Sequence, residues 1–494
     1  MTNLANNSKG YFVEPGLLGA RLDASYYTPD AIQAEQRLVT GEQSGNFNVQ
    51  PLEDICSYIM DFQAFSIYNF VEFSETYKDG WIEFLRVQDL NRGFVDTEKV
   101  LWTSPQSHEL MKKSVVQPGD ILLSIIGTLG VATRWTKGHE CNSNQCIAKI
   151  RLKPQYDPGY LVAALNSQTM QILIHRDATG TVQKGLSLGG TRRLRLPLPD
   201  PKIQAYIGDK VRLAERCREE ANRCESQSTK ILFDLLGWPI NFLHEQSHFV
   251  DPGIVSDRLD PKYYQVKYLQ TIQHIRNHAN GYVLLDNLVE SVSNGSEYRE
   301  YTNEGMPYLT VGDISGGRLL WKKAPRIPLS APISARGRLD VHDVLVVRTG
   351  SIGQAAFVHH ACKDAVISSH FIKLRLKSPR QAPWIAFFLN SVVGKILLER
   401  IAYGAIQPQI GQDELLQIPI PLIDQKYQKE LATLWSRFIF LNELSEDLIT
   451  EATQDVENLI SGKLDISILQ VEDQKKITWE SIEQRFQDEI TEDA

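Results

Sequence analysis

GDILLSIIGTLG at residues 119–130 returns as HDVLVVRTGSIG at residues 342–353. In both segments an acidic residue precedes a short apolar run, and a Gly-x-x-Gly sequence follows it. Runs rich in Ile, Leu and Val that end at glycine are typical of buried strands followed by tight turns. The repetition predicts that two halves of the chain share one fold.

Other segments repeat in the same order, which makes chance similarity a poor explanation. The pair that begins at residues 21 and 258 is offset by 237 residues, and all the other pairs are offset by 222 to 224. A period above 200 residues indicates two like domains, because solenoid repeats are far shorter. The repeated pairs are RLDASYY (21–27) with RLDPKYY (258–264), WIEFLRVQDLNRG (81–93) with GMPYLTVGDISGG (305–317), IAKIRLK (147–153) with FIKLRLK (371–377), LNS (165–167) with LNS (389–391), and RLPLPD (195–200) with QIPIPL (417–422).

Local patterns predict the elements of each half. Strands are expected at 121–126 and 147–152, with counterparts at 344–348 and 371–376, and one helix is expected at 158–175 and again at 383–400. Each half ends in a Pro-x-Pro segment, which favours extended backbone. A long helix then follows, at 201–236 and at 425–460, with apolar residues at coiled-coil spacing. Cys217 and Cys224 fall on this seam, so packing explains them better than redox chemistry does.

The sequence therefore predicts an α+β fold class. Two similar α/β domains are expected to be separated by two long antiparallel helices that form a coiled coil. The repeat symmetry makes this a pseudo-twofold dumbbell, with helices of about 50 Å at 1.5 Å per residue.

The charge is distributed unevenly. The whole chain has a net charge of −8, but residues 424–494 contain 7 basic and 17 acidic residues. The segment 75–200 has a net charge of +4, and the segment 305–421 has +7. Two mildly basic regions and an acidic tail are compatible with nucleic-acid binding, although ordinary surface charge explains either region alone about equally well.

Signatures of catalysis, metal binding and membrane insertion are missing from the sequence. It contains no phosphate-binding GxxxxGK[ST] loop, no GxSxG elbow, no HExxH and no CxxC pair. We expect neither a metal site nor a catalytic residue. The longest uncharged stretches, 121–133 and 381–394, are too short to span a bilayer. With no secretory signal at the N-terminus, a reduced, cytoplasmic protein is expected.

Two similar but non-identical domains held apart by long helices are suited to bind a linear target with two separate recognition sites. Double-stranded DNA is the obvious target of this kind. On its repeated segments, the sequence resembles the specificity subunit of a Type I restriction-modification system. The resemblance rests on the opening pair of segments and on ATGTVQ (178–183) with AYGAIQ (402–407), each leading into Pro-x-Pro and a long helix. It covers about residues 17–460.

The resemblance implies a non-catalytic subunit that directs its partners to DNA. Those partners are two methyltransferase subunits and the restriction and translocase subunits, and there is no membrane partner. No cofactor is expected in this chain, and S-adenosylmethionine, ATP and Mg belong to the partner subunits. The implied organisation is target recognition domain 1 at 1–200, spacer helix 1 at 201–237, target recognition domain 2 at 238–422, spacer helix 2 at 423–461 and an acidic C-terminal tail at 462–494. Residues 464–494, beyond the resemblance, are expected to form a short extra helix or a mobile tail.

DNA-contacting residues are predicted from repeat position and side-chain chemistry. Arginine pairs well with guanine, glutamine and asparagine pair with adenine, and lysine or hydroxyl groups suit phosphate. The candidates in the first half are Arg86, Gln88, Asn91, Arg92, Lys184, Arg192 and Arg193. Those in the second half are Thr310, Arg348, Thr349, Ser351, Gln354, Gln407 and Gln409. Arg348 is the sharpest candidate, because Ile125 occupies its place in the first half.

Three alternatives remain open at this stage. The chain could be a recognition module of another modification or phage-defence machine, or a scaffold that binds only proteins. It could also be a nuclease, with Asp89 and Asp313 at matching repeat positions. A capping or turn role is the stronger interpretation of those two carboxylates.

Overall fold

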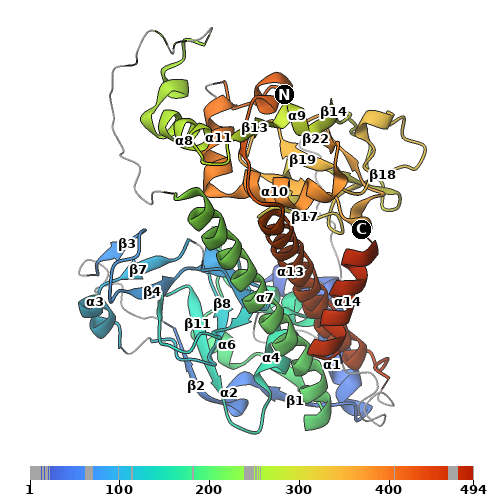
Figure 1. Cartoon of the computed structure of the whole chain (residues 1–494). Helices are drawn as coiled ribbons and strands as arrows, with labels where there is room; N and C mark the ends of the chain where they lie inside the picture. Colours follow the sequence, from blue (N-terminus) through green and yellow to red (C-terminus); the bar gives the residue numbers. More distant parts are fainter. Residues whose placement is uncertain are drawn as a thin grey trace, which may run out of the picture. The chain divides into compact units, whose positions relative to one another are not determined.

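The computed structural model describes residues 13, 16, 21, 23–61, 71–97, 99–112, 115–180, 183–238, 250, 253, 255, 258–404, 407–465 and 477–492. The chain divides into two compact units, each assembled from segments that are distant in sequence. Unit 1 contains residues 1–219 and 443–477, and unit 2 contains residues 220–442 and 478–494. Figure 1 shows the two long helices α7 (Pro201–Leu236) and α13 (Gln425–Ile460). One part of each helix belongs to unit 1 and the other part belongs to unit 2.

Unit 1 is organised around an antiparallel sheet of strand order β2-β11-β8-β9. The second sheet has the order β10-β4-β7-β3, and β1 pairs with β12. Leu122, Trp135 and Ile147 pack into the core between these elements. The bounds are α1 Pro29–Gln43, β1 Asn48–Pro51, α2 Leu52–Ile55, β2 Cys56–Met60, β3 Phe73–Ser74, β4 Ile82–Leu85, β5 Leu90–Asn91, β6 Phe94–Val95, β7 Leu101–Thr103, α3 Pro105–Leu110, β8 Ile121–Ser124, β9 Ala132–Arg134, β10 Asn142–Ser143, β11 Ile147–Leu152, α4 Pro158–Asn166, α5 Gln168–Asp177, α6 Leu188–Arg192 and β12 Arg195–Leu198.

Unit 2 repeats this plan with the sheet β14-β22-β19-β20, the sheet β18-β15-β21 and the pair β13-β23. Its core gathers Leu345, Val347 and Phe371. The mixed helix and sheet composition of both units confirms the predicted fold class. The bounds are α8 Val266–Arg276, β13 Tyr282–Leu284, α9 Leu285–Leu288, β14 Val289–Asn294, β15 Met306–Leu309, β16 Ile314–Ser315, β17 Arg318–Leu319, β18 Arg326–Ile327, β19 Val344–Val347, β20 Ala355–Phe357, β21 Val366–Ile367, β22 Phe371–Leu376, α10 Ala382–Asn390, α11 Val392–Ile401, α12 Gln412–Leu416, β23 Pro419–Pro421 and α14 Trp479–Glu492.

The duplication extends to individual side-chain hydrogen bonds. In unit 1, Nε of Arg151 donates to Oδ1 of the buried Asp120 at 2.8 Å. In unit 2, Nε of Arg375 donates to Oδ1 of the buried Asp343 at 3.0 Å. Both pairs join the residue just before one strand, β8 or β19, to the neighbouring strand, β11 or β22. The repeated segments therefore mark equivalent positions in two like folds.

The single helix predicted at 158–175 and again at 383–400 is wrong in both halves. The structure has two helices at each place, α4 with α5 and α10 with α11. The break falls at Ser167 and Ser391, whose hydroxyls accept from backbone N–H groups of the following helix. Serine is a favoured N-cap, so the repeated LNS segment ends one helix and begins the next.

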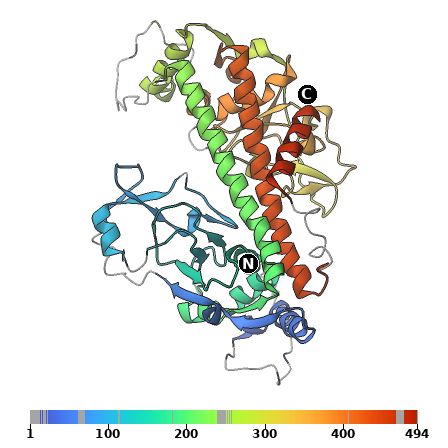
Figure 2. The ribbon, with the colours of Figure 1, turned by 60° about the horizontal axis from the view of Figure 1, so that its bottom comes forward.

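The bounds predicted for the two long helices are confirmed at both ends. Within unit 1 their segments are antiparallel, because Lys210 contacts Asp455 at 2.7 Å while Ala214 accepts from Ser445 at 2.9 Å (Figure 2). Cys217 is fully buried on this seam, which confirms its predicted packing role.

Helix α14 packs on the unit 2 part of α13. The ring of Phe486 packs against that of Phe440 at a tilt of 44°, with centroids 5.4 Å apart, and Arg437 donates to Glu483 at 2.9 Å. A short extra helix was one of the two expectations for this segment. Among the described helices, none by itself is long and apolar enough to cross a membrane, although the bent pair Pro379–Asn390 and Val392–Ile401 passes on length and composition.

Candidate nucleic-acid interface

Three loops of unit 1 meet at the tip of the β8–β9 hairpin. The first loop is the 3-10 turn Val87–Asp89, and the second is the Gly-x-x-Gly turn that begins at Gly127. The two loops are close, because a Cβ added to Gly127 would lie 3.8 Å from Cγ1 of Val87. The third loop closes over that turn, because Gly185 forms a bridge with Ile126. We call residues 86–89, 125–130, 179–180 and 183–186 the loop cluster of unit 1.

Unit 2 has the same arrangement. Cγ1 of Val311 lies 3.8 Å from the Cβ position of Gly350, and the backbone N–H of Gly350 donates to the carbonyl of Pro408 at 3.2 Å. Thr349 forms a bridge with Gln409. The loop cluster of unit 2 comprises residues 310–313, 348–353, 403–404 and 407–410. The repeated glycine segments and the closing loops therefore converge twice, once in each unit.

The repeated Arg-Leu-Asp segment anchors the approach to each closing loop. Nη1 of Arg258 donates to the carbonyl of Ile401 at 2.9 Å, at the end of α11. The same guanidinium pairs with Asp260 at 2.9 Å and holds the pKa of that carboxyl below its usual value. In unit 1, Nη1 of Arg21 donates to the carbonyl of Asp177, at the end of α5. This motif has a structural role that the sequence did not reveal.

Most candidates from the second half lie in the loop cluster of unit 2. Arg348 is half-buried, and its guanidinium makes no hydrogen bond or ion pair with the residues that the structure describes. Thr349 is almost completely buried and contributes through its backbone bridge. Ser351 and Gln407 are exposed, and Gln409 is half-buried. These positions combine an available arginine with exposed hydroxyl and amide groups.

Gln354 lies just beyond the cluster, next to β20. Its side-chain Oε1 is buried without a hydrogen-bond partner. Its backbone carbonyl accepts from the N–H of Val347 at 3.0 Å, which closes the β19–β20 hairpin.

Arg86 and Thr310, two of the predicted DNA-contacting residues, instead form the N-terminal caps of matching 3-10 turns. Asp89 accepts from the backbone N–H of Arg86 at 2.7 Å and pairs with its guanidinium at 3.0 Å. In the matching turn, Asp313 accepts from the backbone N–H of Thr310 at 2.8 Å and from its hydroxyl at 2.7 Å. The capping interpretation of the two aspartates is confirmed. Gln88, which lies in sequence between Arg86 and Asp89, is exposed.

The remaining candidates from the first half are dispersed. Lys184 is exposed in the loop cluster of unit 1. Asn91 belongs to the β5–β6 hairpin, where the following Arg92 reaches Gln171 of α5 at 3.4 Å. Arg192 and Arg193 are exposed at the end of α6, where Arg192 reaches the carbonyl of Ile59 at 3.4 Å. The structure brings Lys184 and Gln88 to the cluster and leaves the other four on neighbouring elements.

Sequence reasoning missed two residues at the cluster of unit 2, one beside it and one within it. Lys395 is exposed on α11, with its Cγ 3.6 Å from the Cβ position of Gly353. Its counterpart is Gln171, which donates to the carbonyl of Gly130 at 2.6 Å and so supports the turn. Tyr403 is 45% exposed in the closing loop and offers an aromatic face. Comparing the repeats position by position would have found the first, because a lysine replaces a glutamine there.

The central strand of each main sheet carries one buried lysine. Lys149 of β11 is fully buried, its Nζ has no hydrogen-bond partner, and burial lowers its pKa to about 8. Its counterpart Lys373 donates to the carbonyl of Arg338 at 2.6 Å, and burial lowers its pKa as well. The same position is therefore satisfied in unit 2 and unsatisfied in unit 1.

Comparison with curated proteins supports the interpretation drawn from the repeats. Over 183 residues the chain is 30% identical to the "Type I restriction enzyme EcoBI specificity subunit" of Escherichia coli. The chain is similar to a specificity subunit. This confirms the resemblance inferred from the repeated segments. The matched region spans 36% of this chain and 37% of the EcoBI subunit, and no family model matches.

Solved structures of Type I restriction-modification subunits cover most of the chain at low identity. The S subunit from M. genitalium aligns over 85% of this chain and 96% of its own, with 12% identity and a TM-score of 0.41. The HsdS subunit from Thermoanaerobacter tengcongensis aligns over 85% and 97%, with 14% identity and a TM-score of 0.26.

Proposed function

We propose that this chain is the DNA-recognition subunit of a Type I restriction-modification system, in which each unit binds one half of a bipartite double-stranded target. The similarity to the EcoBI specificity subunit carries the proposal. The presence of one loop cluster in each unit supports it. The two clusters share a backbone arrangement but carry different polar side chains, which suits two different half-sites.

The two loop clusters differ where base recognition would require it. Arg348 stands in unit 2 where Ile125 stands in unit 1, and the backbone is the same, since Ile410 and Leu186 donate to the respective carbonyls at 2.8 Å. An arginine without an internal partner can form a bidentate pair with guanine, whereas isoleucine offers only an apolar contact. The two half-sites should therefore differ in sequence.

The chain would act through its partners. We propose that it directs two methyltransferase subunits and the restriction and translocase subunits to the target, in the cytoplasm. S-adenosylmethionine, ATP and Mg would bind to those partners, and this chain would perform no catalysis. The two carboxylates considered for a nuclease site are engaged in capping turns, which favours a non-catalytic role.

Methylation mapping tests the proposal directly. The chain is expressed with its neighbouring methyltransferase subunit in a host that lacks other modification systems, and methylated positions are read across the genome. We expect methylation at one bipartite sequence, and none when either protein is expressed alone. Methylation or cleavage by the isolated chain would refute the proposal, and so would a target that is not bipartite.

A further inference from the structure

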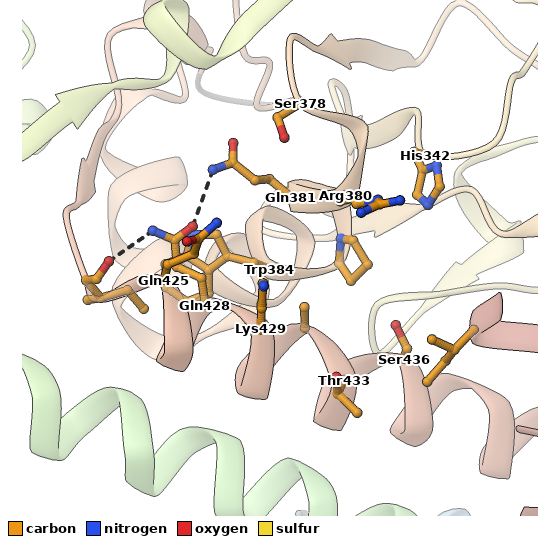
Figure 3. A pocket seen from close by; sticks show the side chains of 14 residues that line it. His342, Ser378, Arg380, Gln381, Trp384, Gln425, Gln428, Lys429, Thr433 and Ser436 are labelled. Atoms are coloured by element: carbon orange, nitrogen blue, oxygen red, sulfur yellow. Dashed lines mark hydrogen bonds between the residues drawn. The ribbon is translucent and has the colours of Figure 1, made fainter. Parts of the chain in front are cut away.

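A groove of about 730 Å³ lies in unit 2 along the N-terminal half of α13 (Figure 3). One wall is formed by Gln425, Lys429, Thr433 and Ser436, which lie on successive turns of that helix. The other wall is formed by the segment from Ser378 to Trp384 together with His342, and Ile490 of α14 also lines the groove.

The equivalent place in unit 1 is closed by direct contact between two helices. In unit 1 the backbones of α4 and α7 approach closely, since a Cβ on Gly159 would lie 2.7 Å from the carbonyl oxygen of Gly208. Both carboxylate oxygens of Asp157 also accept from Arg212 at 2.9 Å across that contact. The counterparts in unit 2 are Pro383, Ala432, Gln381 and Ser436. All four line the groove, and the last two cannot form the ion pair.

A strained residue lines the groove. His342 has a φ of 72°, and it is the one non-glycine residue with positive φ among those that the structure describes. The counterpart in the matching turn of unit 1 is Gly119, with a φ of 89°. The left-handed conformation is unfavourable for residues with a Cβ, so histidine weakens a turn that glycine would form without strain. Strain retained at a cavity wall points to a role for the side chain there.

The chemistry of the lining selects the ligand. Among the described residues that line it, the ionisable side chains are those of His342, Arg380 and Lys429, and none of these residues carries a carboxylate. Lys429 is exposed and makes no ion pair or hydrogen bond within the described part of the chain. Three glutamines also line the groove. Gln381 donates to Gln428 at 3.3 Å, and Gln428 donates to the carbonyl of Ile423 at 3.0 Å. The amide of Gln425 can pair with a peptide backbone. The site therefore suits a negatively charged ligand that also has backbone-like polar groups.

The shape selects a polypeptide. From Gln425 to Ser436 the wall extends about 16 Å at 1.5 Å per residue. That length accommodates about five residues of extended chain at 3.3 Å each. A single phosphate group would fill only a small part of it, and DNA is read by elements that protrude into its grooves rather than by a concave surface.

We propose that this groove binds an acidic segment of a partner protein. The inference goes beyond DNA recognition and does not depend on it. The groove distinguishes unit 2 from unit 1, so the two units would not be equivalent for this partner.

A fluorescein-labelled octaglutamate peptide serves as the probe, with fluorescence anisotropy measured on the full chain at low salt. We expect saturable binding that weakens as salt is added, and no binding of octaglutamine. Lys429→Glu should weaken octaglutamate binding at least fivefold. Lys262→Glu is the matched control, because it makes the same change of charge at an exposed position outside the groove. Equal binding by these two variants would overturn the proposal.

Two further variants separate a binding role from a structural one. Thr433→Trp places a bulky side chain in the groove from an exposed position and should abolish octaglutamate binding with an unchanged melting temperature. His342→Gly relieves the strained turn, so it should raise the melting temperature while weakening octaglutamate binding at least twofold. Unaltered binding in both variants would overturn the proposal.

Competition identifies the ligand class. Millimolar inorganic phosphate should leave octaglutamate bound, and duplex DNA should bind Lys429→Glu and Lys262→Glu equally well. Displacement by phosphate would instead identify a compact anion site. Loss of duplex binding in Lys429→Glu alone would assign the groove to DNA. Either result would overturn the proposal, and neither depends on whether the chain directs methylation.

Discussion

Replacing the buried Lys149 with methionine should stabilise unit 1. Lys149 lies on β11 between β2 and β8, and its ammonium is buried where water cannot reach it and no acceptor bonds to it. Burial lowers its pKa from 10.5 to about 8. At about 1.4 kcal/mol per pKa unit, the charged form is destabilised by about 3 kcal/mol in the fold. Methionine fills a similar volume without the charge, so we expect a gain of about 2 kcal/mol at pH 7.

The gain should depend on pH in a defined direction. Because the pKa in the folded state lies below that in the unfolded state, the unfolded chain binds more protons between pH 8 and about 10.5. The stability contributed by this group in the wild-type protein therefore rises with pH across that window. The advantage of the methionine variant should be largest below pH 8 and should be lost before pH reaches about 10.5.

Hydrogen exchange of peptides that cover β11 measures this effect, because it reports opening of unit 1 separately from unit 2. Lys373→Met is the matched control, measured on β22. Its ammonium donates to the carbonyl of Arg338, so its removal should give no gain, or a loss of about 1 kcal/mol. A destabilised Lys149→Met at pH 7, or a gain that does not change with pH, would refute the reasoning.

Three further predictions concern recognition and the supporting turns. Arg348→Ala should weaken DNA binding by about 1–3 kcal/mol and relax specificity in one half-site only, as measured by binding to a panel of substituted duplexes; uniform weakening on all duplexes would make it a phosphate contact instead. Asp313→Ala removes the acceptor for two groups of Thr310 and should lower the free energy of unfolding of unit 2 by about 1 kcal/mol, as followed by hydrogen exchange; an unchanged stability would contradict the capping role. Exchanging residues 17–200 for the equivalent segment of a relative should change one half of the methylated sequence and leave the other intact, and a change in both halves would show that the units do not read independently.

The sequence by itself determined the duplication, the fold class and the two long helices. The Pro-x-Pro segments and the glycines that follow each helix act on the adjacent backbone, so the bounds of α7 and α13 follow from local residues. Side-chain capping at Ser167 and Ser391 is a local effect as well. The apolar pattern, however, continues through both serines and by itself predicts an unbroken helix. That is why one helix was expected where the structure has two.

Only the tertiary structure decided which polar side chains are available. Arg86 and Arg348 look alike in sequence, but one is paired with Asp89, while the other has no partner among the described residues. Lys149 and Lys373 occupy one repeat position, and only the second finds an acceptor. These outcomes depend on atoms contributed by segments distant along the chain. A side chain's chemistry is fixed by its residue type, but its freedom to bind another molecule is fixed by what the fold places beside it.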